Sequence, residues 1–254
     1  MKQLSRGVYA RKDFVYKYSN ALKVDKFHKY EDKPAMHKLL GDIRGKSVLC
    51  AGCGNGNECA YMKKKGAKYV VGIDLSESMI ELAKKLHKGI EFHAMSFAKM
   101  DLPDSRFDIV YSDLVIHYMS NRFPAMSESY RVLKPGGRLI FSDTHPIYEM
   151  LERRKRGNSK EALFGYIRKG DKYEVIGNYF AGKIRRSEWF KGYSVKSYRV
   201  TLSDIIMPAI RAGFILKNIM EPRPSKALKK VDPEFYKRLA RVPQALILEF
   251  YKPK

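Results

Sequence analysis

The chain has 254 residues and a formal charge of +23, a length that can bury a substantial core in one or two domains. It has no run of about 18 apolar residues, and its first residues lack the apolar segment of a secretion signal, so we expect a cytoplasmic protein without a membrane span. The excess charge lies at the ends, with net charges of +6 in residues 1–44, +3 in 45–144 and +14 in 145–254.

Residues 1–44 are predicted to form a basic N-terminal arm with one helix that ends near Gly41. The aromatic residues of this arm are interleaved with lysines and are Tyr9, Phe14, Tyr16, Tyr18, Phe27 and Tyr30. Such a pattern fits a lid that packs over a cleft, and it also fits a surface on which nucleic-acid bases stack. We favour the lid, and we assign residues 45–254 to the main domain.

Strands and helices are predicted to alternate through the next hundred residues. Apolar runs predict strands at 47–51, 69–74, 90–95, 108–112 and 138–143, and the intervening segments predict helices at 57–65, 76–88 and 123–133. Ser76 is placed to cap the second of these helices. Alternation with short connections predicts an α/β fold, with a parallel sheet covered by helices on both faces.

The first predicted strand leads into a glycine turn, and the second ends in an acid. The turn holds Gly52, Gly54 and Gly56, and the acid is Asp74. Glycines let the backbone turn tightly and approach a ligand closely, and a carboxylate at this place can accept hydrogen bonds from ribose hydroxyls. The order of strand, glycine turn, helix, strand and acid indicates an adenosine-containing cofactor. Nicotinamide and flavin dinucleotides are disfavoured, because their turns have a third glycine where Asn57 stands.

Two later motifs narrow the choice of cofactor. The segment 107–118 contains the strand predicted at 108–112 and, after it, His117 and Tyr118. Residues 131–137 read Arg-Val-Leu-Lys-Pro-Gly-Gly and precede another predicted strand. Together with the glycine turn and Asp74, these motifs resemble the class I S-adenosylmethionine-dependent methyltransferases. The resemblance is closest to the methyltransferase type 11 domain and to small-molecule enzymes of the ubiquinone and menaquinone biosynthesis type.

The resemblance implies a fold and a cofactor. The fold would be a Rossmann-like doubly wound sheet of seven strands, mostly parallel, with a C-terminal antiparallel hairpin formed by residues 214–221 and 245–251. The helix between the insertion and this hairpin is predicted at 202–212 and closed by Gly213. The cofactor would be S-adenosylmethionine.

An insertion at about 147–200 is expected to cover the active site. We predict in it a basic helix at 149–156 and short antiparallel strands at 173–181, 183–190 and 195–200.

The resemblance also assigns cofactor contacts residue by residue. The glycine turn would hold the methionine and sugar end, Asp74 the ribose hydroxyls, and Leu75 the adenine. The full set is Ala51, Gly52, Cys53, Gly54, Gly56, Asp74, Leu75, Ser96, Phe97 and Ser112. Two acids common in the family are absent, because Cys50 stands where one orients the cofactor's amino group and Ser96 where one binds the adenine amine. We therefore expect the cofactor to be held more weakly or differently.

The sequence gives fewer indications of which residues contact the methyl acceptor. His117 and His145 follow predicted strands at the edge where open α/β sheets bind ligands, so either could take a proton from the acceptor or serve as a structural residue. Tyr118, Trp189 and Tyr193 are candidates for the acceptor wall, and the last two could equally form a small core of the insertion.

No metal site is expected. Cys50, Cys53 and Cys59 fall in one strand, turn and helix, and no second cysteine pair completes a zinc site.

The predicted function is methyl transfer from S-adenosylmethionine to a small molecule, with an anionic or planar acceptor as the first options, by in-line displacement. Two alternatives stay open. The basic flanks could grip RNA, which would make the chain a tRNA methyltransferase, although a lysine-rich solvated surface explains the same charge. The chain could also bind S-adenosylmethionine or S-adenosylhomocysteine without catalysis.

Overall fold

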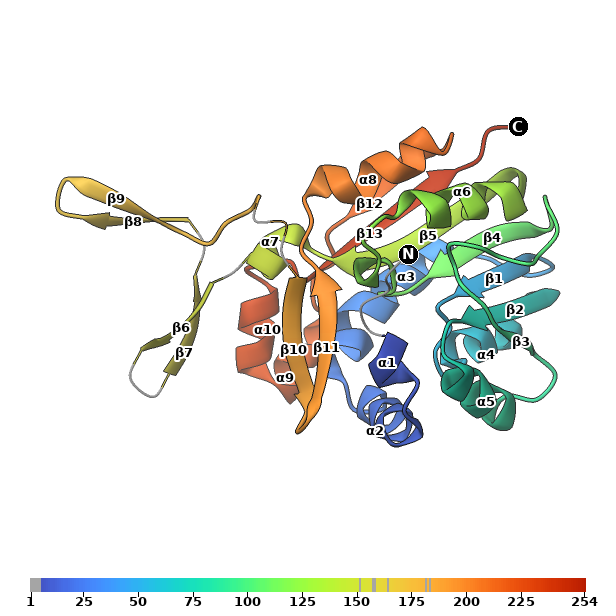
Figure 1. Ribbon diagram of the computed structural model, residues 1–254, viewed down its shortest axis with the longest axis horizontal. Helices are drawn as coiled ribbons and strands as arrows, with labels where there is room; N and C mark the ends of the chain where they lie inside the picture. The colour runs from blue at the N-terminus through green and yellow to red at the C-terminus, as the bar shows by residue number, and fades with distance from the viewer. Residues whose placement is uncertain (1–5, 151, 157–158, 164, 181, 183) are drawn as a thin grey trace.

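The computed structural model describes residues 6–150, 152–156, 159–163, 165–180, 182 and 184–254. Its centre is a seven-stranded sheet with the strand order β12-β13-β5-β4-β1-β2-β3 (Figure 1). Neighbours from β3 to β5 are parallel, whereas β13 runs antiparallel to both β5 and β12. The strands are β1 (Ser47–Ala51), β2 (Tyr69–Asp74), β3 (Glu91–Ala94), β4 (Phe107–Ser112), β5 (Leu133–Thr144), β12 (Ile215–Met220) and β13 (Ala245–Tyr251). The predicted seven-stranded fold with its C-terminal antiparallel hairpin is confirmed.

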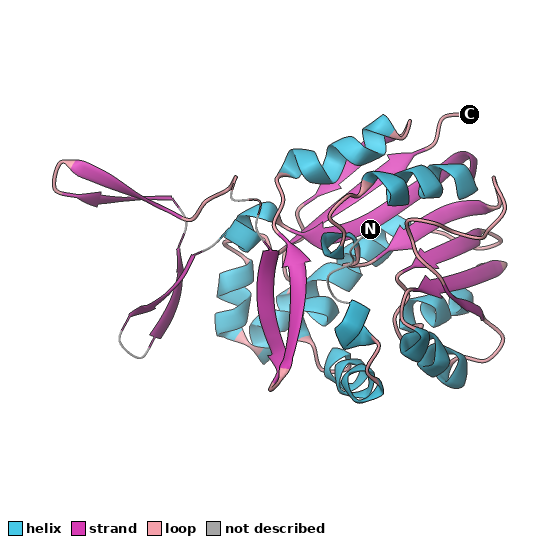
Figure 2. Ribbon diagram, in the orientation of Figure 1, coloured by secondary structure: helices cyan, strands magenta, loops and turns pink. Residues whose placement is uncertain are grey.

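Helices cover both faces of this sheet (Figure 2). Residues of α6 and α8 join one buried apolar cluster, and residues of α3, α4 and α5 join the other. Strand β1 contributes Leu49 to the first cluster and Cys50 to the second, because successive side chains of a strand point to opposite faces. The helices are α3 (Lys33–Leu40), α4 (Asn57–Lys64), α5 (Glu77–Leu86), α6 (Phe123–Val132) and α8 (Leu202–Arg211).

Local signals in the sequence place several of these ends correctly. The Ser76 hydroxyl accepts a hydrogen bond from the Met79 amide at 3.1 Å, which confirms the predicted cap of α5.

Strand β5 begins earlier than predicted, at Leu133. Its pairing with β4 skips from Leu133 to Arg138, so the Lys-Pro-Gly-Gly segment forms an irregularity inside the strand, with Gly136 at φ +75°.

The N-terminal arm contains more helix than predicted. The expected helix ending near Gly41 is α3, and it is preceded by α1 (Arg6–Tyr9), α2 (Lys12–Leu22) and the π-helix η1 (His28–Asp32). Helix α2 packs against the hairpin of β10 (Ile184–Phe190) and β11 (Tyr193–Tyr198). Phe14 lies 5.5 Å from Tyr193 and Tyr18 lies 5.3 Å from Trp189, measured between ring centroids. The arm and this hairpin therefore share one small aromatic core.

The predicted basic helix at 149–156 is wrong. Helix α7 (Pro146–Met150) ends at Met150, and residues 152–156 form β6, which pairs antiparallel with β7 (Ser159–Leu163). Residues 152–156 are all charged and offer no apolar stripe to hold a helix against the protein, while strand pairing satisfies their backbone groups. A second missed pairing joins β8 (Gly165–Lys169) to β9 (Lys172–Ile176). The predicted strand ends at 181 and 183 lie outside the described residues.

The hairpins β6–β7 and β8–β9 extend away from the sheet, whereas β10–β11 lies beside the arm (Figure 1). The remaining elements are the 3-10 helix η2 (Ile116–Tyr118), α9 (Lys226–Val231) and α10 (Pro233–Leu239). No helix in the described part of the chain is long and apolar enough to cross a membrane.

Replacing Phe250 by alanine should lower the free energy of unfolding by about 3–5 kcal/mol. The ring is fully buried, with its centroid 5.8 Å from that of Phe141 and 6.2 Å from that of Phe214, so its loss leaves a cavity in the first cluster. Chemical denaturation measures the change. Ile219, which is 52% exposed on the neighbouring strand, is the control, and its alanine variant should lose about 1 kcal/mol or less. Equal losses would contradict the assigned packing.

Candidate active site

Asp74 is the central charged group of the site. It ends β2, and its Oδ2 accepts a hydrogen bond from the Gly54 amide at 3.0 Å, while Oδ1 accepts one from the Ser76 amide at 2.9 Å. Each carboxylate oxygen has two lone pairs, so both can accept a further hydrogen bond. Burial raises the pKa of Asp74, and the backbone amides act in the opposite direction.

The backbone of the glycine turn is held close to two other strands. The amides of Gly52 and Cys53 both donate to the Ile73 carbonyl at 2.8 Å. Gly52 has a φ of +73°, and a Cβ at this position would lie 2.3 Å from Cγ2 of Val115, which follows β4. Only glycine lets the ends of β1, β2 and β4 meet this closely.

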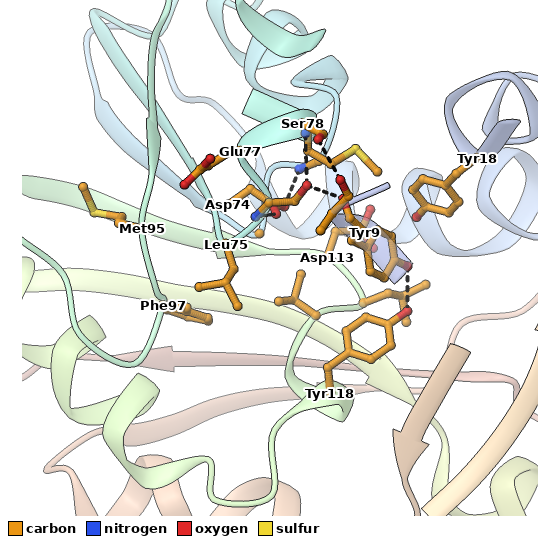
Figure 3. Close-up of a pocket in the computed structure, with 17 residues that line it drawn as sticks. Tyr9, Tyr18, Asp74, Leu75, Glu77, Ser78, Met95, Phe97, Asp113 and Tyr118 are labelled. Carbon is orange, nitrogen blue, oxygen red and sulfur yellow. Dashed lines mark hydrogen bonds between the residues drawn. The ribbon is translucent and has the colours of Figure 1, made fainter. Parts of the chain in front are cut away.

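A cavity of about 280 Å³ opens at this edge of the sheet. Asp74 lies at its middle, Leu75, Met95 and Phe97 line one side, and Tyr9, Tyr18 and Tyr118 line the other (Figure 3). We call it the larger cavity. The charged groups among its described lining residues are all acidic: Asp74, Glu77 and Asp113.

The N-terminal arm contacts the rim of the larger cavity. The hydroxyl of Ser76 donates to the Tyr9 carbonyl at 2.5 Å, and that of Ser78 donates to the Ala10 carbonyl at 3.0 Å. The Tyr9 and Tyr118 hydroxyls are hydrogen-bonded at 3.0 Å. Burial raises the pKa of both phenols, so both stay protonated at neutral pH.

A second cavity of about 80 Å³ shares Tyr18, the glycine turn and Asp113 with the first. We call it the smaller cavity. Glu58 lines it, with Lys33 Nζ 2.9 Å from one of its oxygens and His37 Nε2 2.7 Å from the other. Burial alone would raise the pKa of Glu58, but the hydrogen bond from His37 and the charge of Lys33 outweigh it and hold the pKa at about 2.

Three further ionisable groups lie close together, and two of them, His28 and Asp113, line the smaller cavity. The ligand atoms of His28, Asp32 and Asp113 all lie within 4.8 Å of one another. Burial raises the pKa of Asp113 well above its ordinary range, and the adjacent Asp32 adds to this. Burial would lower the pKa of His28, but its interactions with Asp32 and Asp113 raise it to about 9.

Comparisons with known proteins fit this geometry. Residues 49–141 match a family model described as a methyltransferase domain. The fold superposes with a TM-score of 0.72 on the crystal structure of an S-adenosylmethionine-dependent methyltransferase from Mesorhizobium loti, with 28% identity over 86% of this chain and 96% of that one. The chain belongs to the class I S-adenosylmethionine-dependent methyltransferases. S-adenosylmethionine is therefore its cofactor.

Two relatives show how far the similarity extends. An uncharacterized protein of Haemophilus influenzae is 33% identical over 201 residues, which cover 75% of this chain and 76% of that protein. The malonyl-[acyl-carrier protein] O-methyltransferase of Pseudescherichia vulneris is 34% identical over 103 residues, so the chain aligns with only 41% of that enzyme.

The methyltransferase site brings together many of the predicted cofactor residues. Gly52, Gly54, Asp74, Leu75 and Phe97 line the larger cavity, and Ala51 and Cys53 line the smaller one. Gly56 is the N-cap residue directly before α4, with a φ of +81°, and belongs to neither lining. Ser96 and Ser112 also lie outside both linings, where their neighbours Met95 and Asp113 stand instead. The roles of all these residues toward the cofactor stay predictions.

The predicted acceptor-side residues lie in two different surroundings. Tyr118 lines the larger cavity, Trp189 stacks on the lining residue Tyr18, and Tyr193 packs on the arm and hydrogen-bonds Asp13. His117 and His145 belong to neither lining.

Both histidines are instead paired with acids. His117 Nδ1 lies 3.4 Å from Asp143, and His145 Nε2 lies 2.9 Å from Glu221. Burial lowers the pKa of His145, and Glu221 opposes this only in part.

Residues of the arm and the segment after β4 were missed by the sequence reading. The arm supplies Tyr9, Tyr18, His28 and Lys33, and the turn after β4 supplies Asp113 to Val115. The position of residues 113–115 directly after a strand was a usable signal. Tyr9 and Tyr18 belong to the aromatic pattern from which the lid was predicted, whereas His28 and Lys33 carried no signal, because only tertiary packing brings them to the sheet.

Replacing Gly52 by alanine should abolish measurable cofactor binding and lower stability by more than about 2 kcal/mol, since the new methyl group clashes with Val115 as well as straining the backbone. Calorimetry with S-adenosylhomocysteine and thermal melting measure the two effects. Gly45, at φ +72° with nothing within 4 Å of a built Cβ, is the matched control for backbone strain alone. A Gly52 variant no worse than the Gly45 variant would refute the close contact.

Proposed function

We propose that the chain transfers the methyl group of S-adenosylmethionine to a small acceptor held between the N-terminal arm and the ends of β1 and β4. Asp74 carries the proposal. It is a half-buried carboxylate whose two oxygens can each accept a further hydrogen bond, and it lies between the apolar side and the aromatic side of the larger cavity. The adenosine of the cofactor matches this lining, because its flat base suits the apolar side and its ribose bears two hydroxyls that can bond to Asp74.

The residues present fit the adenosyl group. In the proposed placement, Asp74 accepts hydrogen bonds from the ribose hydroxyls, and Leu75, Met95 and Phe97 hold the adenine by apolar contact. Met95 and Phe97 follow the end of β3 on either side of Ser96, so the adenine would rest on apolar surface rather than on the acid that the family resemblance implies there.

The acceptor would occupy the side of the larger cavity that Tyr9, Tyr18 and Tyr118 line. The acidic charges of this cavity favour a neutral or cationic acceptor over an anionic one. The stack of Tyr18 on Trp189 offers a flat aromatic wall, which supports a planar acceptor.

Bound S-adenosylmethionine supplies a methyl group on a positively charged sulfur that leaves as a neutral thioether. The chain's part is to align the acceptor and exclude water. Tyr9 and Tyr118 can orient the acceptor through their protonated hydroxyls. The aromatic faces around them also suit a nearby positive charge. His117 and His145, the predicted proton acceptors, line neither cavity, so proton transfer to either would need a change in the site or an intervening water.

The arm over the larger cavity supports a small acceptor in preference to RNA. Its backbone carbonyls bond to Ser76 and Ser78, and several of its aromatic rings pack inward on β10–β11. Exposed stacking surface on the arm is thereby reduced, although Tyr16 is 66% exposed. We therefore treat the described part of the arm, residues 6–44, as a lid and β10–β11 as the part of the insertion that supports it.

Replacing Asp74 by alanine should weaken S-adenosylhomocysteine binding by about 1–3 kcal/mol, or roughly 5- to 150-fold, because the ribose loses its acceptors. Isothermal calorimetry measures the change. The exposed Asp101, replaced by asparagine, is the control and should leave affinity unaltered. Unchanged affinity in the Asp74 variant would overturn its assigned role.

Methyl-labelled S-adenosylmethionine should transfer its label to a small-molecule fraction of a cell extract and not to RNA. The Asp74→Ala variant is the control for background labelling. Label in tRNA, together with tRNA binding that weakens steeply with salt, would favour the RNA alternative. Cofactor binding without labelling of any fraction would favour the non-catalytic alternative.

A further inference from the structure

Asp74 has no cationic partner within ion-pair distance among the described residues. Its carboxylate accepts hydrogen bonds from the amides of Gly54 and Ser76, and these neutral groups do not cancel its charge. The ribose hydroxyls proposed to bind it are neutral as well. A positive charge on a bound reactant is therefore attracted to Asp74, and more strongly than in water, because the carboxylate is half-buried.

The negative charge of Asp74 extends to the acceptor side of the larger cavity. Burial raises the pKa of Tyr9 and that of Tyr118, and the Asp74 carboxylate raises both further. The two phenols are hydrogen-bonded at 3.0 Å, and their ring centroids lie 5.9 Å apart at an interplanar angle of 68°. In such an edge-to-face contact, the ring that offers its edge keeps its π-face free, and a π-face attracts a cation.

The acceptor side offers no ready proton acceptor among the described residues. The chain has six histidines, all within the described part, and none of them lines the larger cavity. Tyr9 and Tyr118 stay protonated at neutral pH and cannot take a proton. A hydroxyl or carbon acceptor must lose a proton in order to be methylated, whereas a neutral amine attacks with its lone pair and needs no base.

The three acids of the lining are occupied or placed elsewhere. Asp74 is proposed to bind the ribose, and Glu77 lies on its other side, away from the tyrosines (Figure 3). The Asp113 carboxylate lies within 4.8 Å of ligand atoms of His28 and Asp32, so it faces the cluster beside the smaller cavity. None of the three is therefore placed to take a proton from an acceptor beside the two tyrosines.

We infer that the acceptor is an amine and that the chain methylates its nitrogen, with the amine bound beside Tyr9 and Tyr118 in the larger cavity. The inference rests on the proposed function, because it needs S-adenosylmethionine with its ribose at Asp74. It narrows the acceptor to one chemical class.

Methylation of nitrogen balances without a base. The lone pair of the neutral amine forms the new nitrogen–carbon bond, the sulfur–carbon bond breaks, and its electron pair stays on sulfur in the neutral thioether. The positive charge moves from sulfur to nitrogen, and a primary or secondary product then loses a proton to water. Asp74 and the tyrosine rings thus stabilise a positive charge both before and after the transfer.

Two probes test the inference by calorimetry on the full chain saturated with S-adenosylhomocysteine. Choline carries a trimethylammonium group, and 3,3-dimethylbutan-1-ol is its neutral carbon isostere. The wild type should bind choline roughly 2- to 30-fold more tightly, because the isostere has the shape without the charge. Equal affinities, or tighter binding of the neutral probe, would overturn the inference.

Variants of Tyr118 separate a contact with the cation from a structural role. Tyr118→Leu should bring the ratio of the two affinities close to one, whereas Tyr118→Phe keeps the ring and should keep the ratio within about twofold. Both should bind S-adenosylhomocysteine within about threefold of the wild type. Tyr16→Leu is the matched control on the same arm, because Tyr16 is 66% exposed and lines neither cavity. Equal losses for both probes in Tyr118→Leu would leave the ratio unchanged and would contradict the contact.

The bond that forms can be identified directly by NMR. An extract of cells grown on ¹⁵N-ammonium is incubated with the chain and ¹³C-methyl S-adenosylmethionine, and the methyl carbon of the product should be split by a one-bond coupling to ¹⁵N. A product methyl carbon without this coupling, as in an ester, an ether or a carbon-methylated compound, refutes the inference.

Failure of the proposed function gives a different result. The wild type would then not bind S-adenosylhomocysteine, or it would transfer label to no fraction of the extract. In the second case the comparison of choline with its isostere still decides whether the cavity selects a cation.

Discussion

The site depends on the close approach of the Gly52 backbone to Val115. Two amides of the glycine turn share the Ile73 carbonyl, and the side chain of Val115 occupies the space that a Cβ at Gly52 would need. This contact brings the ends of three strands to one point. Asp74, the glycine amides and Asp113 can therefore serve one ligand, although they are distant in the sequence.

Charge placement follows from this convergence. The acids of the site differ in their partners, because Glu58 is ion-paired with Lys33 and His37, whereas Asp32 and Asp113 lie together with His28. The basic excess of the whole chain does not extend into the larger cavity, whose described charged groups are acidic. The chain as a whole is positively charged, whereas the lining of the cavity proposed to bind the acceptor carries acidic groups.

The central sheet and the cofactor edge could be predicted from the sequence, because their signals are local. The glycine turn, Asp74 and the Ser76 cap can each be recognised in a short stretch of sequence, although Gly52 is required by its contact with the distant Val115. Strand ends were harder to place. Ser96 and Ser112 were chosen where Met95, Phe97 and Asp113 line the cavities, since a shift of one residue reverses the face of a strand. His28, Lys33 and strands β6 to β8 could not be predicted, because they depend on tertiary packing or on pairing between charged segments.

The hydrogen bonds between the arm and α5 have a kinetic consequence. Ser76 and Ser78 belong to the element that follows Asp74, and they bond to the arm backbone at Tyr9 and Ala10. Tyr9 in turn touches Tyr118 on the acceptor side. In the proposed placement, one segment therefore encloses both reactants, so spent cofactor and methylated product leave through a shared opening step. Turnover would then be governed by how often α1 and α2 detach, and less by the speed of the methyl transfer itself.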